Sequence, residues 1–202
     1  MNKGKSPERR GRPRAFNIEE ALDRALQVFW QRGYEGASLD DLTEAMGISR
    51  PSLYAAFGDK ETLFRKALDR YEDGPSSFVR EALNEPTARG VVERLLDGAA
   101  RMHTDPKTPP GCLMVHGALA SGEGAASIRR ELTSRRAADE AGLRRRLVRA
   151  KAEGDIPRDA DPADLARYVV TIIRGMAVQA AGGASRSALR RVVQMALRAW
   201  PE

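Results

Sequence analysis

The chain has 202 residues, one cysteine and a formal net charge of +6 at pH 7. This length is sufficient for a buried core without metals, and a single cysteine excludes an intramolecular disulfide framework, as is typical of a reducing compartment. The basic N-terminus lacks the apolar stretch of a signal peptide, and no uncharged run is long enough to span a bilayer, so we expect a soluble, cytoplasmic protein without membrane contact.

Residues 1–15 are expected to form a disordered basic arm, because they show no apolar periodicity before Phe16. The first 14 residues hold six basic side chains and one acidic side chain. Arg10, Arg12 and Arg14 form a compact strip of guanidinium groups that fits a narrow minor groove of double-stranded DNA. The alternative is a solvated tail that only improves solubility.

The first helical pattern begins at Asn17, which forms a capping box with Glu20, and we expect Gly33 to end it. Its apolar residues recur at helical spacing and share one face. They are Ile18, Ala21, Leu22, Ala25 and Phe29.

The next segment is expected to form two short helices around a tight turn. Ser38 is an N-cap with Asp41 three residues on, a near capping box. Gly47 can adopt the left-handed backbone that ends the first helix, and Ser49 caps the second, whose first turn tolerates Pro51. The apolar residues that hold the pair together are Leu39, Leu42, Ala45, Met46, Ile48, Leu53 and Phe57.

A second helix this short and this tightly held is typical of a helix-turn-helix, which places a recognition helix in the major groove. DNA binding is therefore the leading hypothesis. Residues 15–60 hold four basic and eight acidic side chains, so the module itself is acidic. Attraction to phosphate must come from the arm and from a few well-placed donors.

Helical patterns continue almost to the end of the chain, without an alternating strand pattern or an internal repeat. The expected helices cover about residues 60–71, 89–103, 112–119, 125–153, 163–181 and 185–200. The fold class is therefore all-α, with an N-terminal three-helix DNA-binding domain and a larger helical domain for ligand binding and dimerisation. We interpret the arginine-rich run of residues 129–151 as a solvated helix face, with an anionic ligand or DNA as the alternative.

The last two helices carry more apolar surface than one core can cover. Few positions between Arg167 and Gln179 are polar, and a helix that is apolar most of the way round must be covered on more than one side. Small residues such as Gly175 and Ala177 permit close approach. We therefore expect a homodimer through residues 163–200, which suits a palindromic DNA site.

The sequence lacks the spacing of catalytic and metal sites, since His103 and His116 are the two histidines and Cys112 is the single cysteine. We expect neither an enzyme nor a cofactor. Cys112 lies at a helix start with His116 one turn away, so a sensor thiol of lowered pKa and a soft-metal site remain as alternatives. The simplest interpretation is that both side chains are packed in the core.

The segment Ala15–Leu68 resembles the DNA-binding domain of the TetR family of bacterial transcriptional regulators. The matching positions are Ala25, Phe29, Gly33, Tyr34, Ser38, Leu39, Leu42, residues 45–49, Leu53, Tyr54, Phe57, Lys60, Glu61, Leu63 and Phe64. The later helices are similar to the family's variable C-terminal domain in their order and in their dimer-like ending. The resemblance implies a DNA-binding domain over residues 16–62 and an effector-binding and dimerisation domain over residues 63–202.

The resemblance also implies DNA contacts. Arg50 is the best candidate for direct base reading, of guanine in particular. The family contacts phosphate through residues that match Tyr54 and Lys60, and the helix capped by Ser38 can present its first amides to a phosphate. For Tyr54 the alternative is a buried core tyrosine. Ala55 is smaller than its counterpart in many relatives, so thymine methyl groups, DNA shape and the arm carry more of the readout. The remaining candidates on this helix are Ser49, Pro51 and Ser52.

The predicted function is a sequence-specific, homodimeric repressor that a small-molecule effector releases from a palindromic operator. The family mechanism implies that the effector shifts the C-terminal domain, and that the helix of residues 60–71 moves the two recognition helices out of register. The alternative is an architectural DNA-binding protein that senses nothing. A sizeable apolar pocket between residues 85 and 180 would favour the first function.

Overall fold

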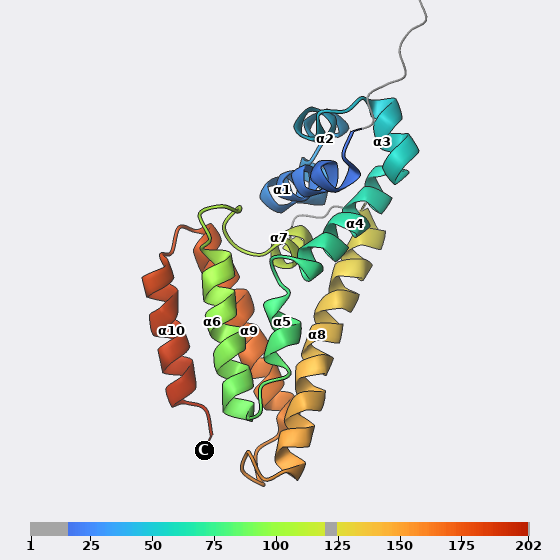
Figure 1. Ribbon diagram of the computed structural model, residues 1–202. Helices are drawn as coiled ribbons and strands as arrows, with labels where there is room; N and C mark the ends of the chain where they lie inside the picture. Colours follow the sequence, from blue (N-terminus) through green and yellow to red (C-terminus); the bar gives the residue numbers. More distant parts are fainter. Residues whose placement is uncertain (1–15, 120–124, 202) are drawn as a thin grey trace, which may run out of the picture.

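The computed structural model describes residues 16–119 and 125–201, which form ten helices and no strand (Figure 1). The all-α fold class predicted from the sequence is confirmed. In chain order the helices are α1 (Ile18–Gly36), α2 (Leu39–Met46), α3 (Arg50–Phe57), α4 (Lys60–Asp73), α5 (Phe78–Ala82), α6 (Ala88–His103), α7 (Leu113–Leu119), α8 (Ala126–Ala152), α9 (Pro162–Ala181) and α10 (Arg186–Arg198). None of these described helices is long and apolar enough to cross a membrane.

The cap residues identified in the sequence begin and end the short helices as predicted. Ser38 Oγ accepts a hydrogen bond from the Asp41 backbone N at 3.1 Å, and the Ser38 backbone N donates to Asp41 Oδ2 at 3.0 Å, which completes the capping box. Ser49 and Asp59 accept backbone hydrogen bonds at the starts of α3 and α4, and Gly47 ends α2 with φ 68°. Local hydrogen bonds therefore fix the ends of the helix-turn-helix.

The regular helix that begins at Ile18 breaks at Gly33, where the sequence predicted its end, with φ 69° and ψ 179°. A short helical segment that was not predicted follows the break and carries α1 on to Gly36. This combination is open to glycine and strained for any residue with a Cβ. Tyr34, directly after the break, packs against Phe64 of α4 with ring centroids 5.3 Å apart. The added turn is therefore supported by a tertiary contact that a helix-end signal does not contain.

The sequence pattern did not predict α5. This helix has five residues, and Ser77 makes no side-chain hydrogen bond at its start. Phe78 instead packs over α6 at Gly98, where a Cβ would collide with the phenylalanine ring. So short a helix depends on packing rather than on local propensity, and for that reason it leaves no clear sequence signal.

Two buried cores hold the described chain together. The first joins α1–α4 with α7, the beginning of α8 and Ala177 of α9, and the second joins α5, α6, α10 and most of α9 with the rest of α8. In Figure 1, α4 and α7 lie between the α1–α3 end of the molecule and the helical bundle below. The domain division at residue 62 stays a prediction, since α4 packs in the same core as α1–α3.

Gly33→Ala tests the break in α1. We expect a loss of about 1–3 kcal/mol in the free energy of unfolding, because alanine is strained at this φ and ψ. Gly36→Ala is the matched control, since its added Cβ would meet only Arg32 Cβ, at 3.5 Å. The control should be neutral or stabilising by up to about 1 kcal/mol. Urea unfolding measures both variants, and equal effects would contradict the assignment of strain to Gly33.

Candidate DNA-binding surface and ligand cavity

The outer face of α3 is the exposed side of the helix-turn-helix. Leu53 and Phe57 are buried and hold the inner face of the helix in the first core. Tyr54 is 49% exposed, so the alternative of a buried core tyrosine is wrong. The other predicted contacts on α3 and its cap are Ser49, Pro51 and Ala55, which are exposed, and Ser52, which is half-buried.

Arg50, in the first turn of α3, is held by an acidic side chain of α2. Its Nη2 and Nε donate to Asp40 Oδ1 at 2.6 and 3.2 Å. The two side chains are 53% and 78% exposed, so the pair contributes about 0–1 kcal/mol to stability. Its larger effect is to fix the direction of the guanidinium group. Sequence reasoning missed Asp40, because the contact crosses the turn and follows no helical spacing.

Ser38 and Lys60 lie at the starts of α2 and α4. The Ser38 hydroxyl donates to Asp41 Oδ2 at 2.6 Å, and the hydrogen bonds from Ser38 are the main cause that lowers the pKa of Asp41 to about 2. Lys60 Nζ lies 4.6 Å from the centre of the Tyr34 ring, and partial burial lowers the pKa of this lysine. Both side chains are therefore oriented by neighbours at helix N-termini, where the helix dipole favours an anion.

The predicted arm contacts Arg10, Arg12 and Arg14 lie outside the described residues. Phe16, the first described residue, has its ring centroid 6.4 Å from that of Phe57, the last residue of α3. The described part of the chain therefore begins beside the C-terminal end of α3.

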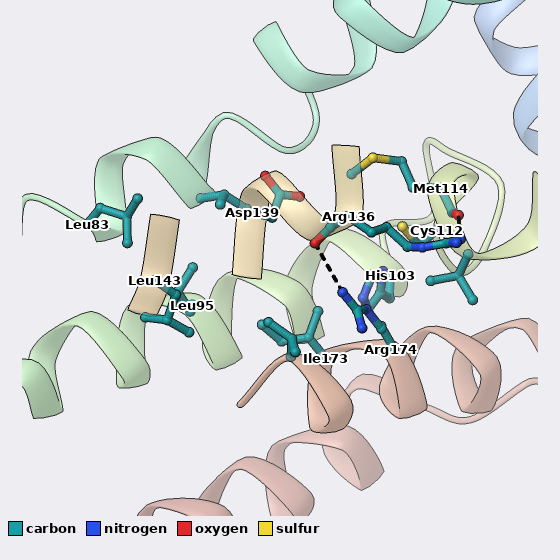
Figure 2. A pocket seen from close by; sticks show the side chains of 13 residues that line it. Leu83, Leu95, His103, Cys112, Met114, Arg136, Asp139, Leu143, Ile173 and Arg174 are labelled. Atoms are coloured by element: carbon teal, nitrogen blue, oxygen red, sulfur yellow. Dashed lines mark hydrogen bonds between the residues drawn. The ribbon is translucent and has the colours of Figure 1, made fainter. Parts of the chain in front are cut away.

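A largely apolar cavity of about 630 Å³, its open mouth included, lies among α5, α6, α8 and α9 (Figure 2). Leu95, Leu143 and Val170 are buried side chains of its wall, one from each of α6, α8 and α9. The chain before and within α7 closes another side through Cys112 and Met114. Most of the wall therefore lies between residues 85 and 180, where a pocket was expected to favour an effector.

Two arginines bring charge into this cavity. Arg136 Nη1 donates to the Met114 carbonyl oxygen at 2.9 Å, and Arg174 Nη2 donates to the Arg136 carbonyl oxygen at 3.2 Å. Arg174 Nη2 also lies 3.7 Å from Glu140 Oε2. Burial is the main cause that lowers the pKa of Arg136, and the neighbouring Arg174 lowers it further.

Asp139 is the acidic side chain among the lining residues, and it forms no hydrogen bond or ion pair with another described residue. Although its side chain is exposed, desolvation by the surrounding wall, followed by the charge of Glu72, raises its pKa to about 6. Arg174 and Arg135 act in the opposite direction. The Asp139 carboxyl group therefore gains a proton, and becomes neutral, only slightly below neutral pH.

His103 is fully buried at the cavity wall. Its Nδ1 lies 3.1 Å from the Gly111 carbonyl oxygen and must be the donor, because a carbonyl only accepts. The other ring nitrogen, Nε2, has no hydrogen-bond partner. Burial lowers the pKa of His103 to about 4, although the backbone groups of Gly111 and Ile173 act in the opposite direction and raise it. The ring is therefore neutral at pH 7.

Of the two predicted sensor candidates, Cys112 lines the cavity and His116 is half-buried near it. The Cys112 side chain is 8% exposed and accepts a hydrogen bond from the Tyr71 hydroxyl at 3.3 Å. Burial raises the pKa of its thiol, the opposite of the lowered pKa that a reactive thiol requires. No group of three His, Cys, Asp or Glu among the described residues is arranged to hold a metal ion. The geometry favours a packed thiol over a sensor.

The arginine-rich run of α8 is not wholly the solvated face that we expected. Arg136 lines the cavity, and Arg146 is 6% exposed, with Nη2 donating to two carbonyl groups before α6 at 2.8 and 2.9 Å. Arg135 bridges to Asp69 and Glu72 of α4 at 2.7 and 3.0 Å. Sequence reasoning missed these roles because arginines occur on every side of this helix, and only tertiary packing separates them.

An apolar face on α9 and α10 is uncovered in the single chain. Tyr168 and Val178 of α9 are 37% and 50% exposed, and Val192 and Met195 of α10 are 41% and 68% exposed. Ala177, predicted to permit close approach between copies, is instead buried in the first core. Val192 and Met195, three residues apart, share one side of α10, and these exposed apolar side chains are available to a second copy of the chain.

Comparison with protein families gives two matches. Residues 21–67 match the model described as "Bacterial regulatory proteins, tetR family", and residues 86–196 match "Tetracyclin repressor-like, C-terminal domain". Together they cover the helix-turn-helix and most of the helices that form the cavity.

Relatives and solved structures agree with these matches. The HTH-type transcriptional repressor ComR of Escherichia coli (strain K12) is 38% identical over 195 residues, 96% of this chain and 93% of ComR. The HTH-type transcriptional regulator YezE of Bacillus subtilis (strain 168) is 31% identical over 79% of this chain and 83% of YezE. A cysteine mutant of the TetR family regulator CifR, solved with 26bp double-strand operator DNA, has a TM-score of 0.89 and 45% identity over 94% of this chain and 100% of that chain.

The buried thiol supplies a test of the local packing at the cavity. We expect Cys112 in the folded protein to react with iodoacetamide at pH 7.5 at least about 100 times more slowly than in urea, because it is buried and its pKa is raised. Mass spectrometry of timed samples measures the rate. Reaction at the rate of the unfolded chain would contradict the packed thiol and restore the sensor interpretation.

Proposed function

Since the chain belongs to the TetR family of bacterial transcriptional regulators, we propose that it acts as a cytoplasmic homodimeric repressor, which leaves a palindromic operator when a small molecule fills the cavity. The observation that carries the proposal is the pairing of an exposed recognition helix, fixed by Leu53 and Phe57, with a cavity in the second half of the chain. An architectural protein that senses nothing would not require such a cavity.

We propose that α3 enters the major groove with Pro51 and Ala55 toward the bases and with Tyr54 on a phosphate. Lys60 and the N-terminus of α2, capped by Ser38, would contact the flanking backbone. Supporting this arrangement, the side chains on α3 are exposed on one face while the opposite face is buried. The other contacts that we propose are Ser49, Ser52 and, from the arm, Arg10, Arg12 and Arg14.

Arg50 and Asp40 would act as a unit in base reading. Asp40 occupies Nε and one side of Nη2, which leaves the Nη1 and Nη2 end of the guanidinium group free for guanine O6 and N7. The ion pair therefore orients Arg50 before DNA arrives and lowers the entropy lost on binding. Asp40 is a positioning residue in this proposal, since its own charge repels phosphate.

Substitutions of this pair separate base reading from phosphate attraction. Arg50→Ala should weaken binding to a selected operator by about 1–3 kcal/mol relative to random DNA. Asp40→Asn should weaken operator binding but strengthen binding to random DNA, because a negative charge is removed. Glu44→Gln, at an exposed acid of the same helix, is the control and should not weaken operator binding.

Fluorescence anisotropy at fixed salt measures these affinities, after the operator has been selected from randomised duplexes. Equal losses on operator and random DNA for Arg50→Ala would assign Arg50 to phosphate instead. A stronger operator complex with Asp40→Asn would remove the positioning role of Asp40.

The exposed α9–α10 face is the surface that we propose for dimerisation. Met195→Glu places a charge on that face and should raise the fraction of monomer, because burying an unpaired carboxylate is costly. Val148→Glu is the matched control, since Val148 is 51% exposed on a different helix, α8. Light scattering at micromolar concentration should give a dimer for the wild type and the control. A monomeric wild type with intact helicity would contradict the proposal.

Contacts from the cavity wall to α4 provide a route for release. Arg136 faces the cavity, and its neighbour Arg135 bridges to Asp69 and Glu72 of α4. On the same helix, the Tyr71 hydroxyl donates to the cavity-lining Cys112 thiol. A ligand that shifts this wall would therefore shift α4, which begins directly after α3. By linkage, the ligand must bind the DNA-incompetent state more tightly.

A further inference from the structure

The cavity has an apolar end and a polar end. Figure 2 shows Leu83, Leu95 and Leu143 together at one side, and His103, Cys112 and the guanidinium group of Arg136 toward the other. Ile173 lies between the two ends. A ligand that fills this space without leaving polar groups unpaired must itself have one apolar end and one polar end.

The charge at the polar end is positive and incompletely paired. Arg136 donates to the Met114 carbonyl and to Thr133 Oγ1, at 2.9 and 3.2 Å, and forms no ion pair with a described carboxylate. Among the described residues, Arg174 lowers the pKa of Arg136 and the Cys112 side chain raises it. Arg174 is near one carboxylate, that of Glu140, at 3.7 Å. Among the described residues, neither guanidinium group therefore forms a hydrogen bond to a carboxylate.

His103 and Asp139 are the remaining polar groups at this end. His103 Nε2 is buried without a hydrogen-bond partner among the described residues, but because Nδ1 is the donor of this neutral ring, Nε2 only accepts and forms no hydrogen bond with an anionic head group. Asp139 carries the opposing charge, and the charged groups that face it are Glu72 of α4, Arg135 of α8 and Arg174 of α9.

We propose that the effector is an amphipathic anion, with an alkyl or aryl body against Leu83, Leu95 and Leu143 and a carboxylate, sulfonate or similar head group at Arg136 and Arg174. Arginine suits this role because the N–H donors of its planar guanidinium group match the geometry of carboxylate and sulfonate oxygens. The proposal rests on the effector-responsive function above and deepens it by naming the ligand class.

Three probes that share an octyl chain separate the head group from the apolar body. They are 1-octanesulfonate, 1-octanol and octyltrimethylammonium, titrated into the full-length protein by isothermal titration calorimetry at pH 7.5. We expect the sulfonate to bind about tenfold or more tightly than the alcohol, and the cation to bind most weakly, as charged hydrogen bonds predict. The sulfonate stays ionised at every pH used, so any change of its affinity with pH comes from the protein.

Variants of the arginines locate the head group. Arg174→Gln and Arg136→Gln should each weaken octanesulfonate binding about tenfold while leaving octanol binding unchanged. Arg144→Gln, at an exposed position of α8 that does not line the cavity, is the matched control and should change neither. Because Arg136 also holds the Met114 carbonyl, its variant is first checked for unchanged helicity, and Arg174→Gln gives an independent test.

Asp139 adds a test by pH. Its pKa of about 6 means that it loses its negative charge as the pH falls from 7.5 to 5.5. Octanesulfonate binding should therefore strengthen over this range in the wild type and change less in Asp139→Asn, which should also bind the sulfonate more tightly at pH 7.5.

Each contrary result has a distinct meaning. Equal binding of sulfonate and alcohol, or tighter binding of the cation, would overturn the anionic ligand class and leave the repressor proposal standing. Absence of binding by all three probes would also overturn it. A different result would contradict the proposed function itself, namely that the protein selects no operator from randomised duplexes.

Discussion

The structure depends on the burial of α4 between the recognition helix and the cavity. Leu63, Leu68 and Tyr71 of this helix are fully buried. Arg70 adds a two-point ion pair to Asp23 of α1, at 2.7 and 3.0 Å. Because protein interiors are close-packed, α4 cannot move without moving α1 and the helix-turn-helix that packs on it. Helix α4 therefore links the helix-turn-helix end of the molecule to the end that holds the cavity.

Because of this position of α4, the proposed release requires only a small coupling free energy. Only about 1–3 kcal/mol of coupling is needed for a regulatory effect, comparable to one or two well-formed contacts. The Arg135 bridges to α4 and the Tyr71–Cys112 hydrogen bond are contacts of that size, and both join α4 to the cavity wall. The polar end of the cavity adjoins the same contacts, so a charged head group would act where the link is made.

The N-terminal part of the fold was predictable from the sequence because its signals are local. Ser38, Gly47 and Ser49 define helix ends through neighbours within three or four residues, and the apolar spacing then fixes which side of α3 is buried. The break of the first helix at Gly33 was recognised, but the turn that follows it was not, because that turn depends on Phe64 of another helix.

The cavity and the Arg50–Asp40 pair could not be read from the sequence, because both are made by residues distant along the chain. Arg136 and Arg144 look alike in a helix rich in arginine, and only the packing of α6, α7 and α9 turns one of them toward the cavity. The same holds for Cys112, whose position at a helix start suggested a reactive thiol until tertiary burial reversed the direction of its pKa.

If α4 couples the cavity to the operator, ligand and DNA must affect each other's binding reciprocally. Operator affinity is measured with and without saturating octanesulfonate, and octanesulfonate affinity is measured with and without bound operator. Bound octanesulfonate should lower the affinity for the operator, and bound operator should lower the affinity for octanesulfonate by the same factor, because both ligands act on one equilibrium through α4. Octanesulfonate that saturates the cavity without any change in operator affinity would contradict this coupling.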